Sequence, residues 1–469
     1  MATNLYNPDV AVVGAGLSGL RAAREIQNSG LSCVVLESLD RVGGRTLSMP
    51  TKENGKAPVD LGAAWINDSS QTEMFALAQA FGFDLVKQRA EGTSIYQDEL
   101  GNVTPTPYEM ESVLSPEEIG KMDALTATIN KFVERADSNN PRQGPDAAKL
   151  DSMTAMEFVD QECGGDRVAH SLMATVSGSL LGVSPDKISA LQLVHYIKGG
   201  TGLTNAISEL KNGGQYLRIQ QGCQSFATCL AAQLSPGTIQ VSSPVQRIRQ
   251  SEDGCVVETT DGTRYNTKKI VISVPTSLYH KILFEPELPT AKRTLGESTK
   301  FGYYAKTILV FSSPWWQENG LSGCLSSEKG PISFARDSCA PKDGQYSFTC
   351  FHVAKQGQDW SELSAEERQR AVLEHFRTMF NVVVKDVPEP VQILEKEWAK
   401  DPWFGGASVP VMMPGVMTSD AGAAIRDAVG HIHFVGTETA TEWMGYMEGA
   451  IRSGIRGGKE VIAALNQTV

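Results

Sequence analysis

The 469-residue chain has a formal net charge of −12, with 41% hydrophobic and 20% charged residues. This length exceeds one ordinary hydrophobic core, so we expect two or three domains. The acidic balance disfavours nucleic acid and anionic membranes as partners, because both bind basic surfaces. No apolar run is long enough to span a bilayer, and the first apolar stretch lacks the flanks of a signal peptide. We therefore expect a soluble protein without a membrane anchor.

The eight cysteines and seven histidines predict neither disulfides nor a metal site. The cysteines form no Cys-x-x-Cys pair and have no metal-like spacing with the histidines, which favours reduced thiols in an intracellular protein. His431 and His433 flank one position of an apolar run and are interpreted as structural. The tripeptide Gln467-Thr468-Val469 differs from a peroxisomal address. We expect a cytoplasmic location rather than a peroxisomal one, and no metal.

The first forty residues carry the pattern of a nucleotide-binding β-α-β unit. The apolar run Val10–Val13 leads into Gly14-x-Gly16-x-x-Gly19, and a second apolar run, Cys33–Leu36, ends at Glu37. The glycines suit a tight turn, close approach of the backbone to a pyrophosphate, and close packing of helix on strand. Glu37 stands where a carboxylate accepts hydrogen bonds from an adenosine ribose. The pattern predicts a Rossmann-type dinucleotide site.

From about residue 80 to 220 the periodicity is mainly helical. Ser115-Pro116-Glu117-Glu118 places an N-cap, an N1 proline and early acids ahead of an amphipathic run. Residues 138–145 are rich in turn formers, so we expect a surface loop there. The sequence therefore predicts a helical insertion after the nucleotide unit.

Strand patterns return in the second half of the chain. Residues 238–274 alternate with a period of two and contain two Asp-Gly turns, which indicates β-structure. Further along we expect a strand at residues 306–311 and a helix opened by the capping box Ser364-x-x-Glu367. Residues 431–435 are typical of a buried strand, and a long helix is expected over about residues 445–465.

Segments at both ends of the chain resemble the flavin amine oxidases, a family that includes monoamine, polyamine and L-amino-acid oxidases. Residues 40–46 add two glycines and an arginine after Glu37, and residues 60–65 are similar to the family's next flavin-contacting stretch. Residues 436–450 resemble the monoamine oxidase branch. The cofactor-binding residues that the resemblance implies, all for FAD, are Gly14, Gly16, Ser18, Gly19, Glu37, Gly44, Arg45, Ala64, Trp65, Val245, Trp398, Ala407, Gly436, Thr437, Glu438 and Met447.

The same resemblance implies the fold, in the α/β and α+β classes. It has a Rossmann-type FAD-binding domain, with a topology like that of p-hydroxybenzoate hydroxylase, interleaved with a mixed-sheet and helical substrate domain. We expect residues 1–80, 220–285 and 396–469 in the FAD-binding domain. Residues 81–219 and 286–395 are expected in the substrate-binding domain.

The resemblance also implies catalytic roles. Lys306 is similar to the family lysine that reaches flavin N5 through a water, where a cation stabilises the negative charge that develops on O2. The family holds the amine between two aromatic rings, matched here by Tyr446 and Ser408, so half of this cage is present. Trp403 and Phe404 are candidates to complete it. Gln215 resembles a glutamine of the family's substrate cavity.

Ala407 stands where animal monoamine oxidases bind the flavin through a cysteine. Alanine has no sulfur for a thioether, so we expect non-covalent FAD.

The resulting hypothesis is an amine oxidase that converts an amine to an imine, which hydrolyses to an aldehyde or ketone, while O2 becomes H2O2. Its partners are then a small amine and O2. Polyamine oxidation, L-amino-acid oxidation and biosynthetic oxidation of a larger secondary amine remain open. Outside the enzymes, the alternative is a flavin-free binding protein like the GDP-dissociation inhibitors. The preferred amine and the oligomeric state, a homodimer among the options, are left open.

Overall fold

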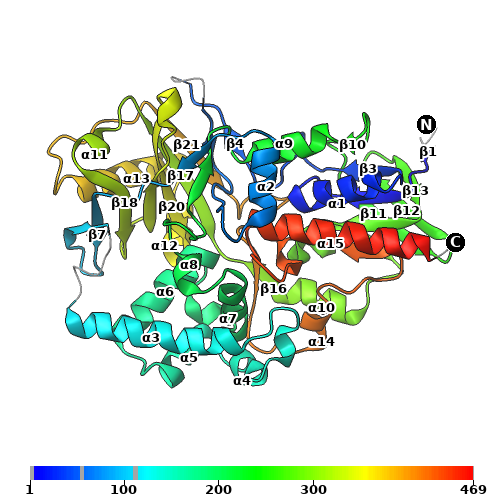
Figure 1. The fold of residues 1–469 in the computed structure, drawn as a ribbon, viewed down its shortest axis with the longest axis horizontal. Helices are drawn as coiled ribbons and strands as arrows, with labels where there is room; N and C mark the ends of the chain where they lie inside the picture. Colours follow the sequence, from blue (N-terminus) through cyan, green and yellow to red (C-terminus); the bar gives the residue numbers. More distant parts are fainter. Residues whose placement is uncertain (1–4, 53–56, 109–114, 468–469) are drawn as a thin grey trace.

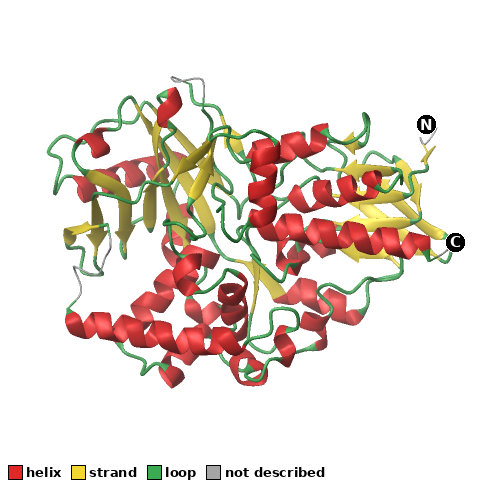
Figure 2. Ribbon diagram, in the orientation of Figure 1, coloured by secondary structure: helices red, strands yellow, loops and turns green. Residues whose placement is uncertain are grey.

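The computed structural model describes residues 5–52, 57–108 and 115–467. Thr468 and Val469 of the C-terminal tripeptide therefore lie outside the described residues. Figure 1 shows three regions. Two stacked sheets with helices lie on the right, a third and larger sheet lies at the upper left, and a layer of helices lies below that third sheet. Figure 2 shows the same division between strand-rich and helix-rich parts. Within the described part of the chain, no helix is long and apolar enough to cross a membrane.

A five-stranded parallel sheet forms the centre of the right-hand region. Its strands, in spatial order, are β10 (Ile239–Gln240), β3 (Cys33–Leu36), β2 (Val10–Val13), β14 (Lys269–Ile272) and β23 (Ile432–Phe434). The strands predicted at residues 10–13, 33–36 and 431–435 are confirmed. The predicted β-structure of residues 238–274 is also confirmed, although it is divided between this sheet and the next.

The second sheet of this region covers one face of the parallel sheet. Its strands are β1 (Leu5–Tyr6), β13 (Arg264–Thr267), β12 (Gly254–Thr259), β11 (Val245–Ser251) and β15 (Leu283–Glu285). Side chains alternate along each strand, so Ala11 and Val13 pack between the two sheets while Val10 and Val12 face the helices. Both faces of the parallel sheet are therefore buried, as its apolar strands require.

The helices on the other face join the two ends of the chain. They are α1 (Leu17–Asn28), α9 (Gln224–Ala232) and α15 (Met447–Asn466). Figure 1 shows α1 and α15 lying side by side. A Cβ on Gly454 would lie only 2.4 Å from the carbonyl oxygen of Ser18, so the absence of a side chain allows this close approach. The long helix predicted at residues 445–465 is confirmed as α15.

A seven-stranded sheet forms the upper left region. Its strands, in order, are β21 (Gln392–Glu397), β17 (Tyr304–Phe311), β20 (Tyr346–Val353), β19 (Phe334–Asp337), β18 (Leu321–Ser327), β7 (Thr93–Gln97) and β8 (Val103–Pro107). The strand predicted at residues 306–311 is confirmed as part of β17. Ala305, Leu309 and Phe311 pack into an aromatic core under α13 (Ala365–Phe380). The opposite face of β17 meets the right-hand region, because Ile308 and Val310 pack with Val59 and Leu61.

The prediction of mainly helical structure from residue 80 is wrong at its start. Residues 85–107 contain β6 (Leu85–Lys87), β7 and β8. The parallel partner of β7 is β18, more than 200 positions along the chain, and β8 carries two prolines at the edge of the sheet. A partner so distant leaves no local signal, and edge prolines weaken the strand pattern.

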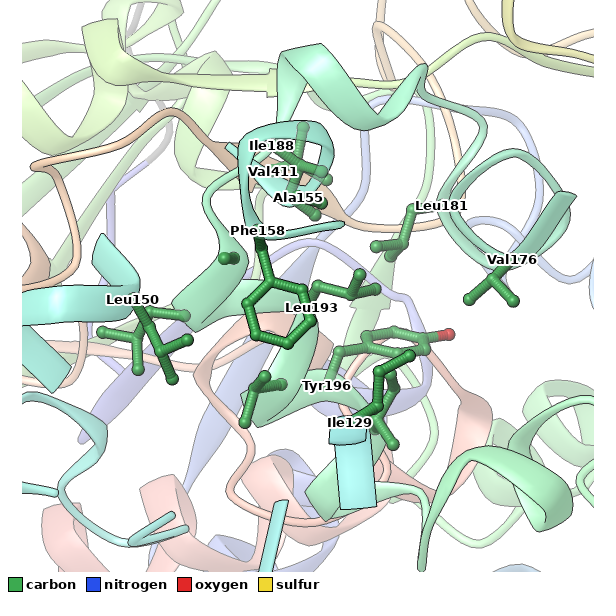
Figure 3. Packing of buried hydrophobic residues seen from close by; sticks show 14 of the residues in the cluster. Ile129, Leu150, Ala155, Phe158, Val176, Leu181, Ile188, Leu193, Tyr196 and Val411 are labelled. Carbon is green, nitrogen blue, oxygen red and sulfur yellow. The ribbon is translucent and has the colours of Figure 1, made fainter. Parts of the chain in front are cut away.

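Helices form the lower layer. Their bounds are α3 (Pro116–Arg135), α4 (Ala147–Asp151), α5 (Ala155–Glu162), α6 (Arg167–Leu181), α7 (Ala190–Gly199) and α8 (Leu203–Ala206). The predicted starts of α3 and α13 are confirmed, since Ser115 and Ser364 each form a complete capping box. Figure 3 shows the core between these helices, in which Tyr196 packs with Ile129 and Leu193.

Candidate active site

A pocket lies where the C-terminal ends of the parallel strands face the seven-stranded sheet. Gly14, Glu37, Ser273 and Gly436 follow β2, β3, β14 and β23 and all line it. Parallel sheets bind ligands at this edge. The predicted site residues in the pocket are Gly14, Gly16, Ser18, Glu37, Gly44, Arg45, Ala64, Trp65, Gln215, Lys306, Trp398, Trp403, Phe404, Ala407, Ser408, Gly436, Thr437, Glu438, Tyr446 and Met447.

Two predicted cofactor residues, Gly19 and Val245, do not line this pocket. Gly19 lies behind it, where a Cβ would meet the carbonyl oxygen of Gly14 at 2.0 Å. Gly19 therefore allows α1 to pack closely against the glycine turn. Val245 begins β11 and packs against the core between the two sheets. The role of Val245 in FAD binding stays a prediction.

The glycine turn leaves open space at the N-terminus of α1. Gly14 has a φ of +102°, which favours glycine. A Cβ on Gly16 would meet no atom within 4 Å, and Gly16 caps α1 without a side-chain hydrogen bond. The first backbone N–H groups of a helix lack intrahelical partners and attract anions. A phosphate therefore fits against Gly16.

Glu37 is buried at the end of β3 with both oxygens held by the backbone. One oxygen accepts from the N–H of Ala15 at 2.7 Å, and the other accepts from the N–H of Leu39 at 2.9 Å. The second of these oxygens also accepts from the Ser38 hydroxyl at 3.2 Å, whereas the oxygen bound to Ala15 keeps a further lone pair for a ligand. The side chain is thereby fixed at the pocket wall as an acceptor suited to ribose hydroxyls.

The C-terminal part of the chain contributes a second helix end and a buried carboxyl group. Tyr446 and Met447, at the start of α15, line the pocket. One oxygen of Glu438 accepts from the N–H of Thr276 at 3.1 Å, while its other oxygen is buried without a hydrogen-bond partner among the described residues. Burial raises the pKa of Glu438, and the nearby Arg45 acts in the opposite direction.

These features fit a dinucleotide that carries a further polar ring. The N-termini of α1 and α15 both face the pocket, and Glu37 offers a hydrogen-bond acceptor. The unpartnered oxygen of Glu438 can form a hydrogen bond with a ligand. A buried polar atom without a partner costs about 1–3 kcal/mol, so a ligand group that satisfies it is favoured. The residues present therefore fit FAD, as the sequence predicts.

Lys306 comes from β17 and reaches the pocket almost fully buried, at 4% exposure. Its Nζ donates to the carbonyl oxygens of Gly62 at 2.5 Å and Asp60 at 3.2 Å, and lies 5.0 Å from the ring centre of Phe351. Burial lowers the pKa of Lys306 to about 8, although the carboxyl of Asp60 opposes this change. An ammonium group has three donors, so one remains for a ligand or water.

Tyr446 and Gln215 lie together in the wall of the pocket. The hydroxyl of Tyr446 donates to the carbonyl oxygen of Ala206 at 3.3 Å, and Nε2 of Gln215 donates to the same oxygen at 3.0 Å. The ring of Tyr446 lies 5.9 Å from Tyr196 and 4.8 Å from Trp443. Burial raises the pKa of Tyr446, so this hydroxyl is neutral.

Ser408 lines the pocket directly after Ala407. Its hydroxyl donates to the carbonyl oxygen of Leu180 at 3.3 Å, and its own carbonyl accepts from Arg45 at 2.5 Å. Phe404 packs edge-on against Trp398, 5.1 Å away, and lies near Gly44. Phe404 therefore lies on the side of the pocket that is formed by Gly44 and the glycine turn before α1.

The pocket also contains aromatic residues that sequence reasoning missed: Tyr196, Tyr304 and Phe351. Tyr304 could have been found from the predicted strand, because it precedes Lys306 by two positions and so shares its face. Phe351 lies directly across from Lys306 in the neighbouring strand β20. That register is a long-range pairing with no local sequence signal.

A Rossmann-type pocket that opens onto a buried lysine and aromatic walls defines a flavin-dependent oxidoreductase. The chain belongs to the family of flavin-containing amine oxidoreductases, whose model matches residues 17–462. It is an FAD-dependent amine oxidase, which oxidises an amine and reduces O2 to H2O2. The predicted family, fold and reaction are thereby confirmed, and the flavin-free binding protein is not supported.

The relatives match over nearly the whole chain. A probable flavin-containing monoamine oxidase A of Dictyostelium discoideum is 30% identical over 97% of both chains. The flavin-containing amine oxidase B of Homo sapiens is 29% identical over 98% of this chain and 87% of its own. Among solved structures, putrescine oxidase bound to putrescine has a TM-score of 0.90, with 26% identity over 98% of this chain and 100% of that chain. Cyclohexylamine oxidase from Brevibacterium oxydans has a TM-score of 0.88, with 28% identity over 98% and 99%.

Proposed function

We propose that this enzyme oxidises monoamines and holds FAD without a covalent bond. The observation that carries the choice of substrate is the distribution of charge in the pocket. Among the described residues that line it, the acidic side chains are Glu37 and Glu438 and the cationic ones are Arg45 and Lys306. Glu37 is held by backbone N–H groups, and Glu438 lies beside Arg45.

This distribution disfavours the alternative substrates. A diamine or polyamine needs a carboxylate for its second ammonium group, and an amino acid needs a free cation for its carboxylate. The amine end around Tyr446 and Gln215 supplies neither, because its walls are aromatic and amide groups. An amine with one nitrogen and an apolar body fits these walls best. The similarity of the chain to oxidases named for monoamines and for cyclohexylamine supports the same choice, although putrescine oxidase, named for a diamine, is equally similar in structure.

Non-covalent binding follows from the chemistry of the pocket wall. The eight cysteines are all free, and neither a cysteine nor a histidine is among the described residues that line the pocket. Ala407 stands at the predicted attachment position and offers no nucleophile. We assign FAD binding to the residues named above for that role and to residues 1–80, 220–285 and 396–469 as a domain. The substrate side is then formed by residues 81–219 and 286–395.

When bound, FAD supplies the two-electron oxidant for the amine and passes the electrons to O2. The chain's own residues prepare that chemistry. Tyr446 and its aromatic neighbours exclude water and so favour the neutral amine over its ammonium form. The positive end of α15 stabilises negative charge at the pocket floor. Lys306, protonated below a pKa of about 8, adds a cation where O2 is reduced.

The first test is the visible spectrum of the purified protein without oxygen, with benzylamine, cyclohexylamine, putrescine and L-leucine added separately. We expect a yellow protein whose flavin bands are bleached by the two monoamines and restored by air. Acid precipitation should leave the FAD in the supernatant. Bleaching by putrescine or L-leucine alone would refute the monoamine substrate, and FAD that stays with the precipitate would refute non-covalent binding.

A further inference from the structure

We infer that Tyr304 forms the second aromatic wall of the amine site, in the space that Ser408 leaves open. The inference rests on the proposed function, because it concerns how the reacting amine is held. It assigns control of substrate width to a strand residue that neither the motifs nor the predicted cage included.

The alternation of β17 directs Tyr304 into the pocket. Tyr304 and Lys306 are two positions apart, so both side chains leave the same face of the strand, and both line the pocket. Tyr303 faces the other way, into the aromatic core of the seven-stranded sheet, and its hydroxyl donates to Glu397 at 2.7 Å. Tyr304 therefore stands beside the only buried ammonium group among the described pocket residues.

Tyr304 and Ser408 are anchored on consecutive carbonyl groups. The hydroxyl of Tyr304 donates to the carbonyl oxygen of Ser179 at 2.8 Å, and the hydroxyl of Ser408 donates to that of Leu180 at 3.3 Å. Both acceptors belong to the last turn of α6. The tyrosine ring and the short serine side chain are thus neighbours on one wall.

The surroundings of Tyr304 hold its ring in place. It packs against the buried cluster of Trp398, Phe404 and Ala407, and its ring lies edge-on to Phe351 with 5.9 Å between ring centres. A ring fixed at its hydroxyl and along one edge loses little rotamer freedom when an amine binds.

Tyr446 supplies another aromatic wall of the pocket. Burial raises the pKa of both Tyr304 and Tyr446, so both phenols are neutral. Both rings line the same pocket. Two neutral, electron-rich rings attract the partial positive charge of an amine that is losing electrons.

The residues expected to complete the cage, Trp403 and Phe404, line the same pocket but make different contacts from Tyr304. Phe404 packs on Trp398 beside Gly44, and Lys281 lies over the ring of Trp403, 5.8 Å from its centre. Phe404 is thus buried next to Gly44, and Trp403 is partly exposed beside Lys281. Tyr304 is the aromatic side chain on the wall that Ser408 shares.

A matched pair of substitutions on one strand tests the inference. Tyr304→Leu removes the pocket ring, and Tyr303→Leu removes the neighbouring tyrosine from the other face. Each holoenzyme is titrated with α,α-dimethylbenzylamine, which has no hydrogen on the carbon next to nitrogen and so cannot be oxidised, and Kd is read from the shift of the flavin bands. Loss of an aromatic wall should raise Kd about 3- to 30-fold in Tyr304→Leu. The Kd of Tyr303→Leu should match the wild type.

Further variants distinguish a Tyr304 ring that contacts the amine from one that only supports the fold. Tyr304→Phe keeps the ring and should keep Kd close to the wild-type value. Ser408→Tyr should crowd the site and weaken binding, whereas Tyr304→Leu combined with Ser408→Tyr should restore it. An unchanged Kd in Tyr304→Leu, or tighter binding in Ser408→Tyr alone, would overturn the inference.

The monoamine proposal and the Tyr304 inference fail in different experiments. If only putrescine or L-leucine bleaches the wild type, the substrate class is wrong. The Tyr304→Leu and Tyr303→Leu pair is then compared by the KM for that substrate, with kcat and FAD content as controls. A rise in KM confined to Tyr304→Leu would still support the wall, and equal KM values would refute it.

Discussion

The buried lysine should make the reaction of the reduced enzyme with O2 depend on pH. Because burial lowers the pKa of Lys306 to about 8, about nine-tenths of the molecules carry its charge at pH 7 and about one-tenth at pH 9. If the cation stabilises the charge that develops on O2, the second-order rate constant for reoxidation should fall about tenfold between these values. The direction is fixed by the sign of the shift: the favourable, protonated form is lost as pH rises through the pKa.

The assay is stopped-flow mixing of the anaerobically reduced enzyme with buffered O2, following the return of the flavin bands from pH 6.5 to 9.5. Lys306→Met should react about a hundredfold more slowly at pH 7 and lose the pH dependence. The control is Lys396→Met, because Lys396 lies directly across from Lys306 on β21 but pairs with Asp401 at 2.7 Å. A Lys306→Met variant that keeps the tenfold slope would refute the reasoning.

Four further variants test the cofactor side of the pocket. Gly19→Ala should destabilise the fold by about 1–3 kcal/mol, because its Cβ would meet the Gly14 carbonyl oxygen at 2.0 Å. Gly16→Ala has open space around its Cβ, so this variant should fold normally but lose FAD. Thermal unfolding and FAD content distinguish the two. Glu37→Gln should weaken FAD binding about 10- to 100-fold in titrations of the apoprotein. Ala407→Cys should retain part of its flavin after acid precipitation.

Each of these outcomes can fail independently. Equal thermal stability of Gly19→Ala and the wild type would contradict the close packing of α1 on the turn. Full FAD retention by Gly16→Ala would place the phosphates away from that glycine. Complete release of FAD from Ala407→Cys would show that residue 407 is not next to the flavin atom to which a cysteine could bond.

The nucleotide unit could be predicted almost to the residue because its signals are local. The strands Val10–Val13 and Cys33–Leu36 are uninterrupted apolar runs, as buried parallel strands are. The glycines between them have individual backbone reasons, such as the φ of +102° at Gly14. The helix starts at Ser115 and Ser364 were also recoverable, since a capping box spans four residues.

The walls of the amine site could not be predicted in the same way. Tyr196 comes from a helix, Tyr304 and Phe351 from neighbouring strands, and their meeting depends on sheet register and helix packing. Tyrosines and phenylalanines of this kind are mostly core residues. The expectation that Trp403 or Phe404 completes the cage relied on closeness in sequence to Ser408. Both rings do line the same pocket as Ser408, and their part in the cage stays a prediction.

The pairing of α1 with α15 has a consequence for how the enzyme matures in the cell. A chain is synthesised from its N-terminus, and its glycine turn leaves the ribosome hundreds of residues before the helix that completes the same pocket. Until residues 436–450 have emerged, the nascent protein lacks the second helix end and Glu438. We therefore expect cofactor loading to be a late event. A chain truncated before the final helix should keep its nucleotide motif but fail to retain flavin.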